Sequence, residues 1–158
     1  MDAEKKREFT RRISQSNRSE LVVIQYEIFY AYMEDAKAAH ETGDYESFRA
    51  AIRKGDRVLA ELSETLDFQY ELAGQLYALY DFSKRALMQC IVKKECQGIE
   101  DAKKALDPLY AAFVQVAAQD TSEPLMQNTQ QVYAGMTYGK QNLKESFQEP
   151  ETSRGFFA

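Results

Sequence analysis

The sequence predicts an all-α fold, an antiparallel up-down four-helix bundle with a polar N-terminal arm and a long C-terminal tail. The first observation is composition, because 158 residues include only 7 Gly and 3 Pro and therefore leave long segments without a helix breaker. The second is a strongly apolar run early in the chain. The third is a series of apolar stripes at helical spacing, joined by short connections that make successive helices antiparallel neighbours.

The central helix is expected at residues 21–40. Between Leu21 and Met33 only Gln25 and Glu27 interrupt the apolar and aromatic residues, so apolar groups point in almost every direction around the helix. A surface helix would carry a single apolar stripe instead. The run makes about 20 Å of helix, less than the roughly 30 Å of a bilayer core. It predicts a buried helix surrounded by others, and no membrane insertion.

The second helix has the strongest helical signature. Apolar residues recur every three or four positions from Tyr45 to Leu66, and Gly55 inside this stripe predicts that the backbone approaches the neighbouring helix closely. Asp44 caps its start, and Gly43 suits the left-handed end of the preceding helix. The N-cap of that preceding helix has three alternatives, Ser16, Asn17 and Ser19.

Two further helices complete the predicted bundle. The helix at about Tyr70 to Lys94 carries two apolar stripes, so it either lies between two neighbours or offers one stripe to a partner. The helix at about Ile99 to Val116 contains Pro108. This proline predicts a kink, or a fresh helix start capped by Asp107.

The two ends of the chain are polar, which gives domain boundaries of 1–16 for the arm, 17–118 for the bundle and 119–158 for the tail. In the arm, Phe9 and Ile13 are four residues apart and would share a helix face. The tail holds three apolar islands, at 125–126, 132–138 and 155–158. Short apolar islands in polar tails often act as binding motifs.

Composition excludes several function classes. A formal net charge of −5 and a pI near 5.0 argue against nucleic-acid binding, which needs clustered Lys and Arg. His40 is the single histidine, and Cys90 and Cys96 form no CxxC pair, so no metal site and no cofactor are expected. The chain has no phosphate loop or nucleophile motif, so we expect no catalysis. The first residues hold no apolar signal-peptide core, which indicates a cytoplasmic protein.

Four ordered sequence pieces resemble the FliS family, the cytoplasmic export chaperones of bacterial flagellin. They are the run Leu21–Glu27, the turn Glu41–Glu46 (ETGDYE), the segment Leu59–Asp67 (LAELSETLD) and the segment Leu76–Arg85 (LYALYDFSKR). The resemblance implies a bundle that holds the apolar helical terminus of flagellin, or of another late flagellar subunit, and prevents its premature assembly. The alternative is a non-chaperone adaptor or assembly regulator built on the same bundle. The protein is expected to be a monomer.

The partner-binding groove is expected between the second and third helices, because aromatic residues with polar tips suit interfaces. The alternative for each tyrosine is a half-buried place at the edge of the core. The predicted groove residues are Leu62, Leu66, Tyr70, Tyr77 and Tyr80.

The free protein is expected to cover this groove, since monomers rarely expose a contiguous apolar patch. In the resembling family the N-terminal arm provides the cover through early tyrosines, where this chain offers Phe9 and Ile13. The C-terminal tail is richer in such residues and is expected to compete with the client. The alternative is a tail that carries a motif for the export gate. The tail candidates are Tyr133, Met136 and Tyr138.

Overall fold

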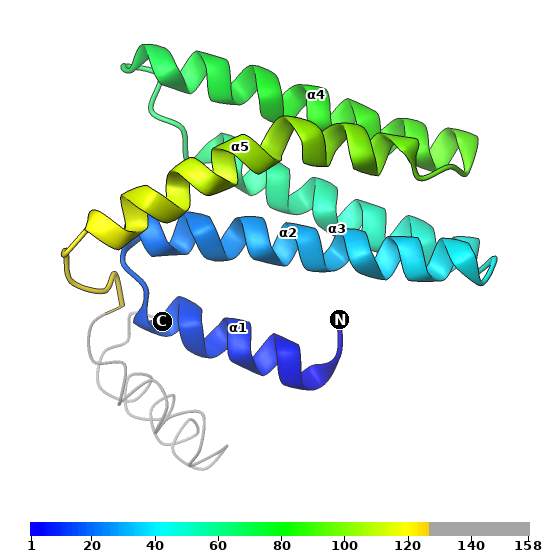
Figure 1. The fold of residues 1–158 in the computed structure, drawn as a ribbon, viewed down its shortest axis with the longest axis horizontal. Helices are drawn as coiled ribbons and strands as arrows, with labels where there is room; N and C mark the ends of the chain where they lie inside the picture. Colours follow the sequence, from blue (N-terminus) through cyan, green and yellow to red (C-terminus); the bar gives the residue numbers. More distant parts are fainter. Residues whose placement is uncertain (127–158) are drawn as a thin grey trace, which may run out of the picture.

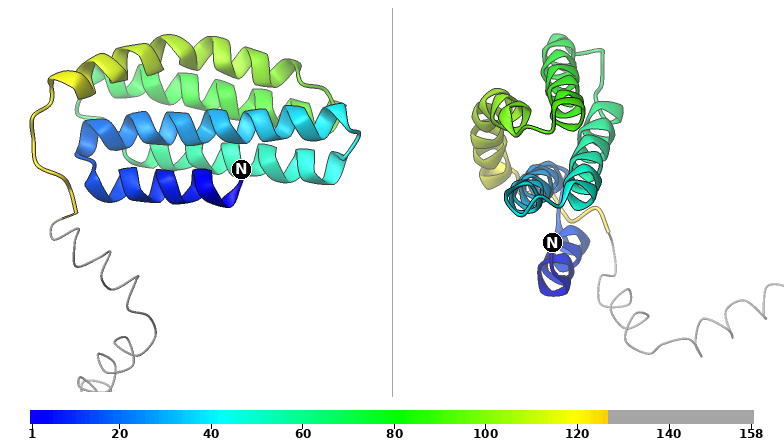
Figure 2. Two further views of the ribbon diagram at one scale, coloured as in Figure 1. Left: turned by 60° about the horizontal axis from the view of Figure 1, so that its bottom comes forward. Right: turned by 90° about the vertical axis from the view of Figure 1, so that its right-hand side faces the viewer.

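The structure is a computed structural model in which residues 1–126 are described, and within this range the chain forms five helices and no strand. The prediction of an all-α fold is confirmed. Helices α2 to α5 run in alternating directions around a shared core, and α1 lies along the outer side of α2 (Figure 1 and Figure 2). The segment expected as an arm is thus a fifth helix. The helices are α1 (Ala3–Gln15), α2 (Arg18–Glu41), α3 (Tyr45–Glu64), α4 (Glu71–Lys93) and α5 (Gln97–Gln119).

Asn17, one of the three predicted N-caps, caps the start of helix α2. The Asn17 side chain accepts a hydrogen bond from the backbone N–H of Glu20 at 2.9 Å, and the Glu20 carboxylate accepts one from the backbone N–H of Asn17 at 3.4 Å. This capping box satisfies two backbone donors at the helix start. The helix ends before Gly43, whose φ of 72° is the left-handed conformation that the sequence predicted.

Helix α2 buries two of its faces, which explains its nearly continuous apolar sequence. One face carries Tyr26, Phe29 and Met33, all fully buried in the core that α2 shares with α3, α4 and α5. The other face carries Ile24 and Ala31, which form a separate buried cluster with Phe9 of α1. The second face gives α1 its place on the bundle.

Helices α3 and α4 present their apolar stripes to the same core. The predicted stripe of α3 is buried from Phe48 to Leu62. Of the two stripes predicted for α4, the structure buries parts of both along a single face, and Leu72 and Tyr77 are left exposed. Helix α4 therefore does not lie between two neighbours along its whole length.

Helix α5 is continuous and contains Pro108, so the alternative of a fresh start at Asp107 is wrong. Before the proline, Ile99 and Leu106 are fully buried; beyond it, the apolar residues of α5 are only partly buried or exposed. Figure 1 shows α5 leaving α4 near its middle and turning toward the start of α2. Proline lacks the N–H of the helix ladder and bends helices in this way. The start of α4 is consequently left without α5 beside it.

Two glycines lie at close contacts between helices. A Cβ on Gly98 would lie 2.1 Å from the backbone carbonyl oxygen of Ala86, so α5 approaches α4 at its backbone there. A Cβ on Gly55 would instead meet the Cε of Met33 at 2.3 Å, the end of a flexible side chain. Gly55 therefore lets side chains of α2 approach the α3 backbone closely, whereas Gly98 lets α5 lie against the backbone of α4.

Replacing Gly98 with Ala should lower the free energy of unfolding by about 1–3 kcal/mol, because the new methyl group overpacks a backbone contact. Gly74 is the control. It lies in α4 with nothing within 4 Å of an added Cβ, so Gly74→Ala should raise stability by up to about 1 kcal/mol. Chemical denaturation followed by circular dichroism measures both. Equal stability of the two variants would contradict the close α4–α5 contact.

Candidate functional site

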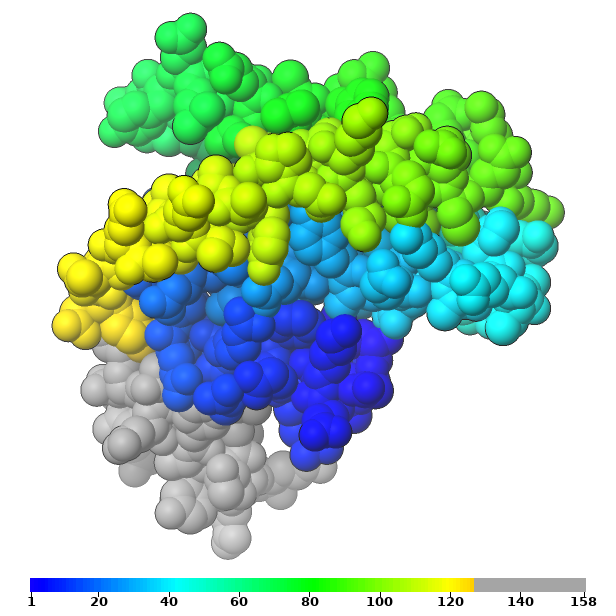
Figure 3. Space-filling view, in the orientation of Figure 1, coloured from blue at the N-terminus to red at the C-terminus, as the bar shows by residue number. Residues whose placement is uncertain are grey.

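An apolar groove of about 560 Å³ lies at the end of the bundle where α5 has turned away from α4. In Figure 3 the start of α4 stands apart from the second half of α5 at this end. The groove is built by the start of α2, the end of α3, the start of α4 and the second half of α5. Its lining residues are Arg18, Leu21, Val22, Gln25, Leu62, Thr65, Leu66, Asp67, Tyr70, Leu72, Ala73, Leu76, Tyr80, Phe113 and Leu125.

The structure brings four of the five predicted groove residues together. Leu62 and Leu66 line the groove from α3, Tyr70 from the connection, and Tyr80 from α4. Tyr77 does not line it. Its ring packs edge-on against Phe68, with centroids 5.9 Å apart, and Tyr77 lines a separate pocket between α3 and α4.

The remaining apolar lining residues were not predicted as part of the groove. Leu72 and Leu76 belong to a stripe recognised on α4, but the stripe alone did not show which part of it faces a groove. Phe113 and Leu125 are distant in sequence from α3 and α4. A periodic pattern reports one helix at a time, and these residues meet only through the turn of α5 and the path of the chain after it.

Tyr80 belongs to the core as well as to the groove. It is 1% exposed, and its hydroxyl lies 2.9 Å from the hydroxyl of Tyr26 on α2, in hydrogen-bond contact. Burial raises the pKa of both phenols; the Tyr80 hydroxyl further raises the pKa of Tyr26, whereas the hydrogen bond to Tyr26 partly offsets the rise in the pKa of Tyr80. Both groups stay neutral and satisfy each other. Tyr80 therefore supports the groove from below, whereas Tyr70, at 69% exposure, stands at its rim.

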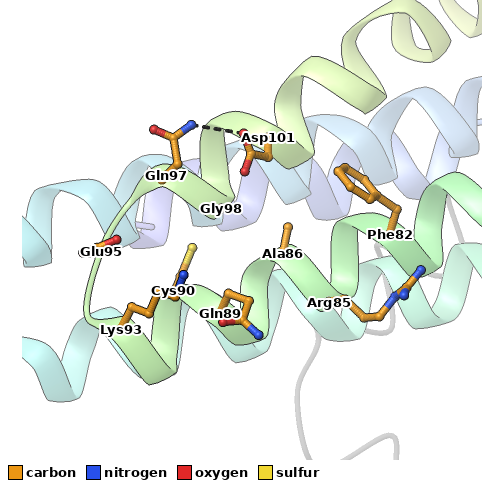
Figure 4. A pocket seen from close by; sticks show the side chains of 10 residues that line it. All are labelled: Phe82, Arg85, Ala86, Gln89, Cys90, Lys93, Glu95, Gln97, Gly98 and Asp101. Carbon is orange, nitrogen blue, oxygen red and sulfur yellow. Dashed lines mark hydrogen bonds between the residues drawn. The ribbon is translucent and has the colours of Figure 1, made fainter.

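The groove is poor in charge, since among its described lining residues only Arg18 and Asp67 are ionisable at neutral pH. A second pocket of about 370 Å³ lies at the opposite end of the bundle, between α4 and α5 (Figure 4). Its lining is more polar: Gln97 donates a hydrogen bond to Asp101 at 3.0 Å, and the charged residues are Arg85, Lys93, Glu95 and Asp101. An apolar ligand fits the first groove better than this pocket.

The family described as "Flagellar protein FliS" matches residues 1–120, a range that includes all five helices. The chain belongs to the FliS family. Membership implies a flagellar export chaperone role, and this family is not one of enzymes. A search of curated proteins finds no match.

Of the residues predicted to cover the groove of this FliS-family chain, only the two N-terminal ones lie in the described part of the structure. Phe9 and Ile13 of α1 pack on Ile24 and Ala31 of α2, in a cluster separate from the groove lining. The N-terminal segment therefore does not cover the groove. The tail candidates Tyr133, Met136 and Tyr138 lie outside the described residues.

The described part of this FliS-family protein contains no group of His, Cys, Asp and Glu side chains that would hold a metal ion. Across residues 1–126, no helix is both long and apolar enough to cross a bilayer.

The Tyr26–Tyr80 contact under the groove gives a stability prediction. Replacing either residue with Phe leaves the other hydroxyl buried without its partner, so each single variant should lose about 1–2 kcal/mol of unfolding free energy. The double variant should lose less than the sum of the two, because no orphaned hydroxyl remains. Urea denaturation of the four proteins measures the coupling. Tyr77→Phe is the control and should change stability by no more than about 0.5 kcal/mol; strictly additive losses would contradict the hydrogen bond.

Proposed function

We propose that this FliS-family protein is a cytoplasmic chaperone whose groove binds an apolar helical terminus of flagellin or of another late flagellar subunit. The observation that carries the proposal is an apolar groove of about 560 Å³ at one end of the described helices. Amphipathic helices bind such grooves by inserting side chains at i, i+3, i+4 and i+7 spacing. The binding unit is the four-helix bundle of α2 to α5, acting as a monomer.

The walls of the groove suit a helix that is apolar on one face. Leu62 and Leu76 are buried and give a firm floor, whereas Leu72 is 59% exposed and would lose that exposure against a client. Burial of apolar surface is worth roughly 25 cal/mol per Å². Tyr70 at the rim offers a large ring with a polar tip, which suits the edge of an interface.

The same chemistry explains how a chaperone of this kind prevents premature assembly. Flagellar subunit termini that carry apolar stripes associate with one another when exposed, and a terminus held in the groove buries its stripe against the chaperone instead. The contact is apolar and nearly free of charge, so an apolar surface can compete with it, and the proposed release involves neither nucleotide nor metal. Displacement by a competing apolar surface at the export gate is sufficient, and nucleic acid has no part in the process.

The alternative function, a non-chaperone adaptor or assembly regulator, would be favoured by a bundle whose own side chains fill every groove. Within residues 1–126 the start of α4 instead keeps Leu72 and Tyr70 exposed beside an open groove. Exposed apolar side chains gathered at one groove are typical of a binding site. We therefore give preference to the chaperone.

Leu72 provides a test of the proposed groove. Leu72→Gln should weaken binding of a synthetic flagellin-terminus peptide about five- to tenfold, because a polar amide would be buried in an apolar contact. Leu72 is exposed in the free protein, so the unfolding free energy should change by no more than about 0.5 kcal/mol. Isothermal titration calorimetry measures the affinity.

Val92→Gln is the matched control. Val92 is 76% exposed on the same helix and lines neither the groove nor the second pocket. Its variant should bind the peptide with the parent affinity. Equal weakening by both substitutions would place the site elsewhere on α4, and failure of the parent protein to bind the terminus of flagellin or of any late flagellar subunit would contradict the proposed function.

A further inference from the structure

We infer that residues 132–138 of the same chain dock in the groove of the free protein, so that a client must displace them to bind. The docking follows from the path of the chain after α5. The competition rests in addition on the proposed function, because it assigns the same groove to the client.

The chain after α5 is fixed against the start of α2. The side-chain amide of Asn17 donates hydrogen bonds to the backbone carbonyls of Asp120 and Ser122, both at 3.3 Å. The hydroxyl of Ser19 donates to the Asp120 carboxylate at 2.5 Å. Asn17 is only 3% exposed, so these contacts are largely shielded from water. Figure 2 shows the segment leaving the end of α5 and passing the start of α2.

This anchor brings the chain to the groove. The backbone N–H of Leu125 donates to the carbonyl of Ser16 at 2.9 Å, and the Leu125 side chain is part of the groove lining together with Leu66 and Phe113. The described chain ends one residue later, at Met126. The following residues therefore start at the groove.

The N-terminal helix α1 is held against α2 by contacts that lie away from the groove. Phe9 of α1 is 8% exposed in its cluster with Ile24 and Ala31 on α2. The Arg12 guanidinium of α1 also pairs with the Glu27 carboxylate of α2 at 2.5 Å. For α1 to cover the groove it would have to leave both contacts. The C-terminal segment has to break nothing that the structure describes.

Residues 132–138 form the first apolar island after the described chain, and their tether to Leu125 is long enough to allow them to meet the groove. Val132 follows Leu125 by seven residues, a tether that spans up to about 23 Å when extended. A tether of this length gives an effective concentration in the millimolar range, and longer tethers give less. The island at 155–158 is much farther along the chain, so its effective concentration at the groove is lower than that of residues 132–138.

The chemistry of this segment matches the groove. Val132 and Met136 are four residues apart and would share a helix face. Residues 127–138 contain no charged side chain, and the groove lining has only Arg18 and Asp67. Occupation of the groove by this segment would lower the apparent affinity for a client in proportion to the fraction of molecules whose groove is unoccupied.

The test compares three full-length chains by amide NMR: the parent, Tyr133→Ser with Met136→Ser, and the control Phe156→Ser with Phe157→Ser. The first double variant should shift the signals of Leu66, Ala73 and Leu76 in the groove, and the control should leave them at their parent positions. The first variant should also bind a flagellin-terminus peptide about threefold or more tightly, because it removes the competitor. The control should bind it with the parent affinity.

The possible results distinguish a failure of the docked-tail proposal from a failure of the proposed chaperone function. Groove shifts confined to the first variant, without any peptide binding, would support the docked tail and contradict the proposed client. Unchanged groove signals in the first variant, with equal peptide affinity in all three chains, would overturn the docked tail and leave the chaperone intact. Groove shifts that grow with protein concentration would also overturn it, because they would assign the groove to a second copy of the chain.

Discussion

Burial of α2 on two faces is the constraint on which the rest of the structure depends. Tyr26, Phe29 and Met33 need cover on one side, and Ile24 and Ala31 need it on another. A single neighbouring helix cannot provide both. Helices α3 and α5 pack on the first side and α1 packs on the second (Figure 2). Helix α1 is therefore part of the folded unit, and the groove is left for other segments.

The groove itself follows from the turn of α5 at Pro108. Before the proline, α5 lies against α4 closely enough that Gly98 meets the backbone of Ala86. Beyond it, α5 approaches α2, where Tyr110 donates a hydrogen bond to Glu27 at 3.1 Å. The start of α4 is thus separated from the second half of α5. One proline gives the bundle a closed end and an open apolar end.

Much of the fold could be predicted from the sequence, because it depends on local patterns. The 3-4 stripe of α3 is buried from Phe48 to Leu62, and Gly43 adopts the expected left-handed conformation. The amphipathic pair Phe9 and Ile13 packs on α2 as a helix would, although the segment was expected to be an arm rather than a fifth helix.

The groove was predictable only in part, because it depends on which elements meet. Tyr77 and Tyr80 are three residues apart on α4, yet one is 49% exposed and the other is buried against Tyr26. Helical spacing places the two tyrosines close together, and only the position of α2 determines which of them is buried. Leu125 reaches the groove through hydrogen bonds to residues more than a hundred positions earlier. No local pattern carries that information.

Hydrogen exchange of the full-length chain, with and without a flagellin-terminus peptide, tests the central claim most directly, namely that the open apolar end of the bundle is the client site. Amides in exchanging segments slow when a ligand orders or covers them. The structure predicts slower exchange at the end of α3 and the start of α4, residues 62–80, with α1 unchanged. Protection confined to α1, or to the α4–α5 turn beside the second pocket, would contradict it.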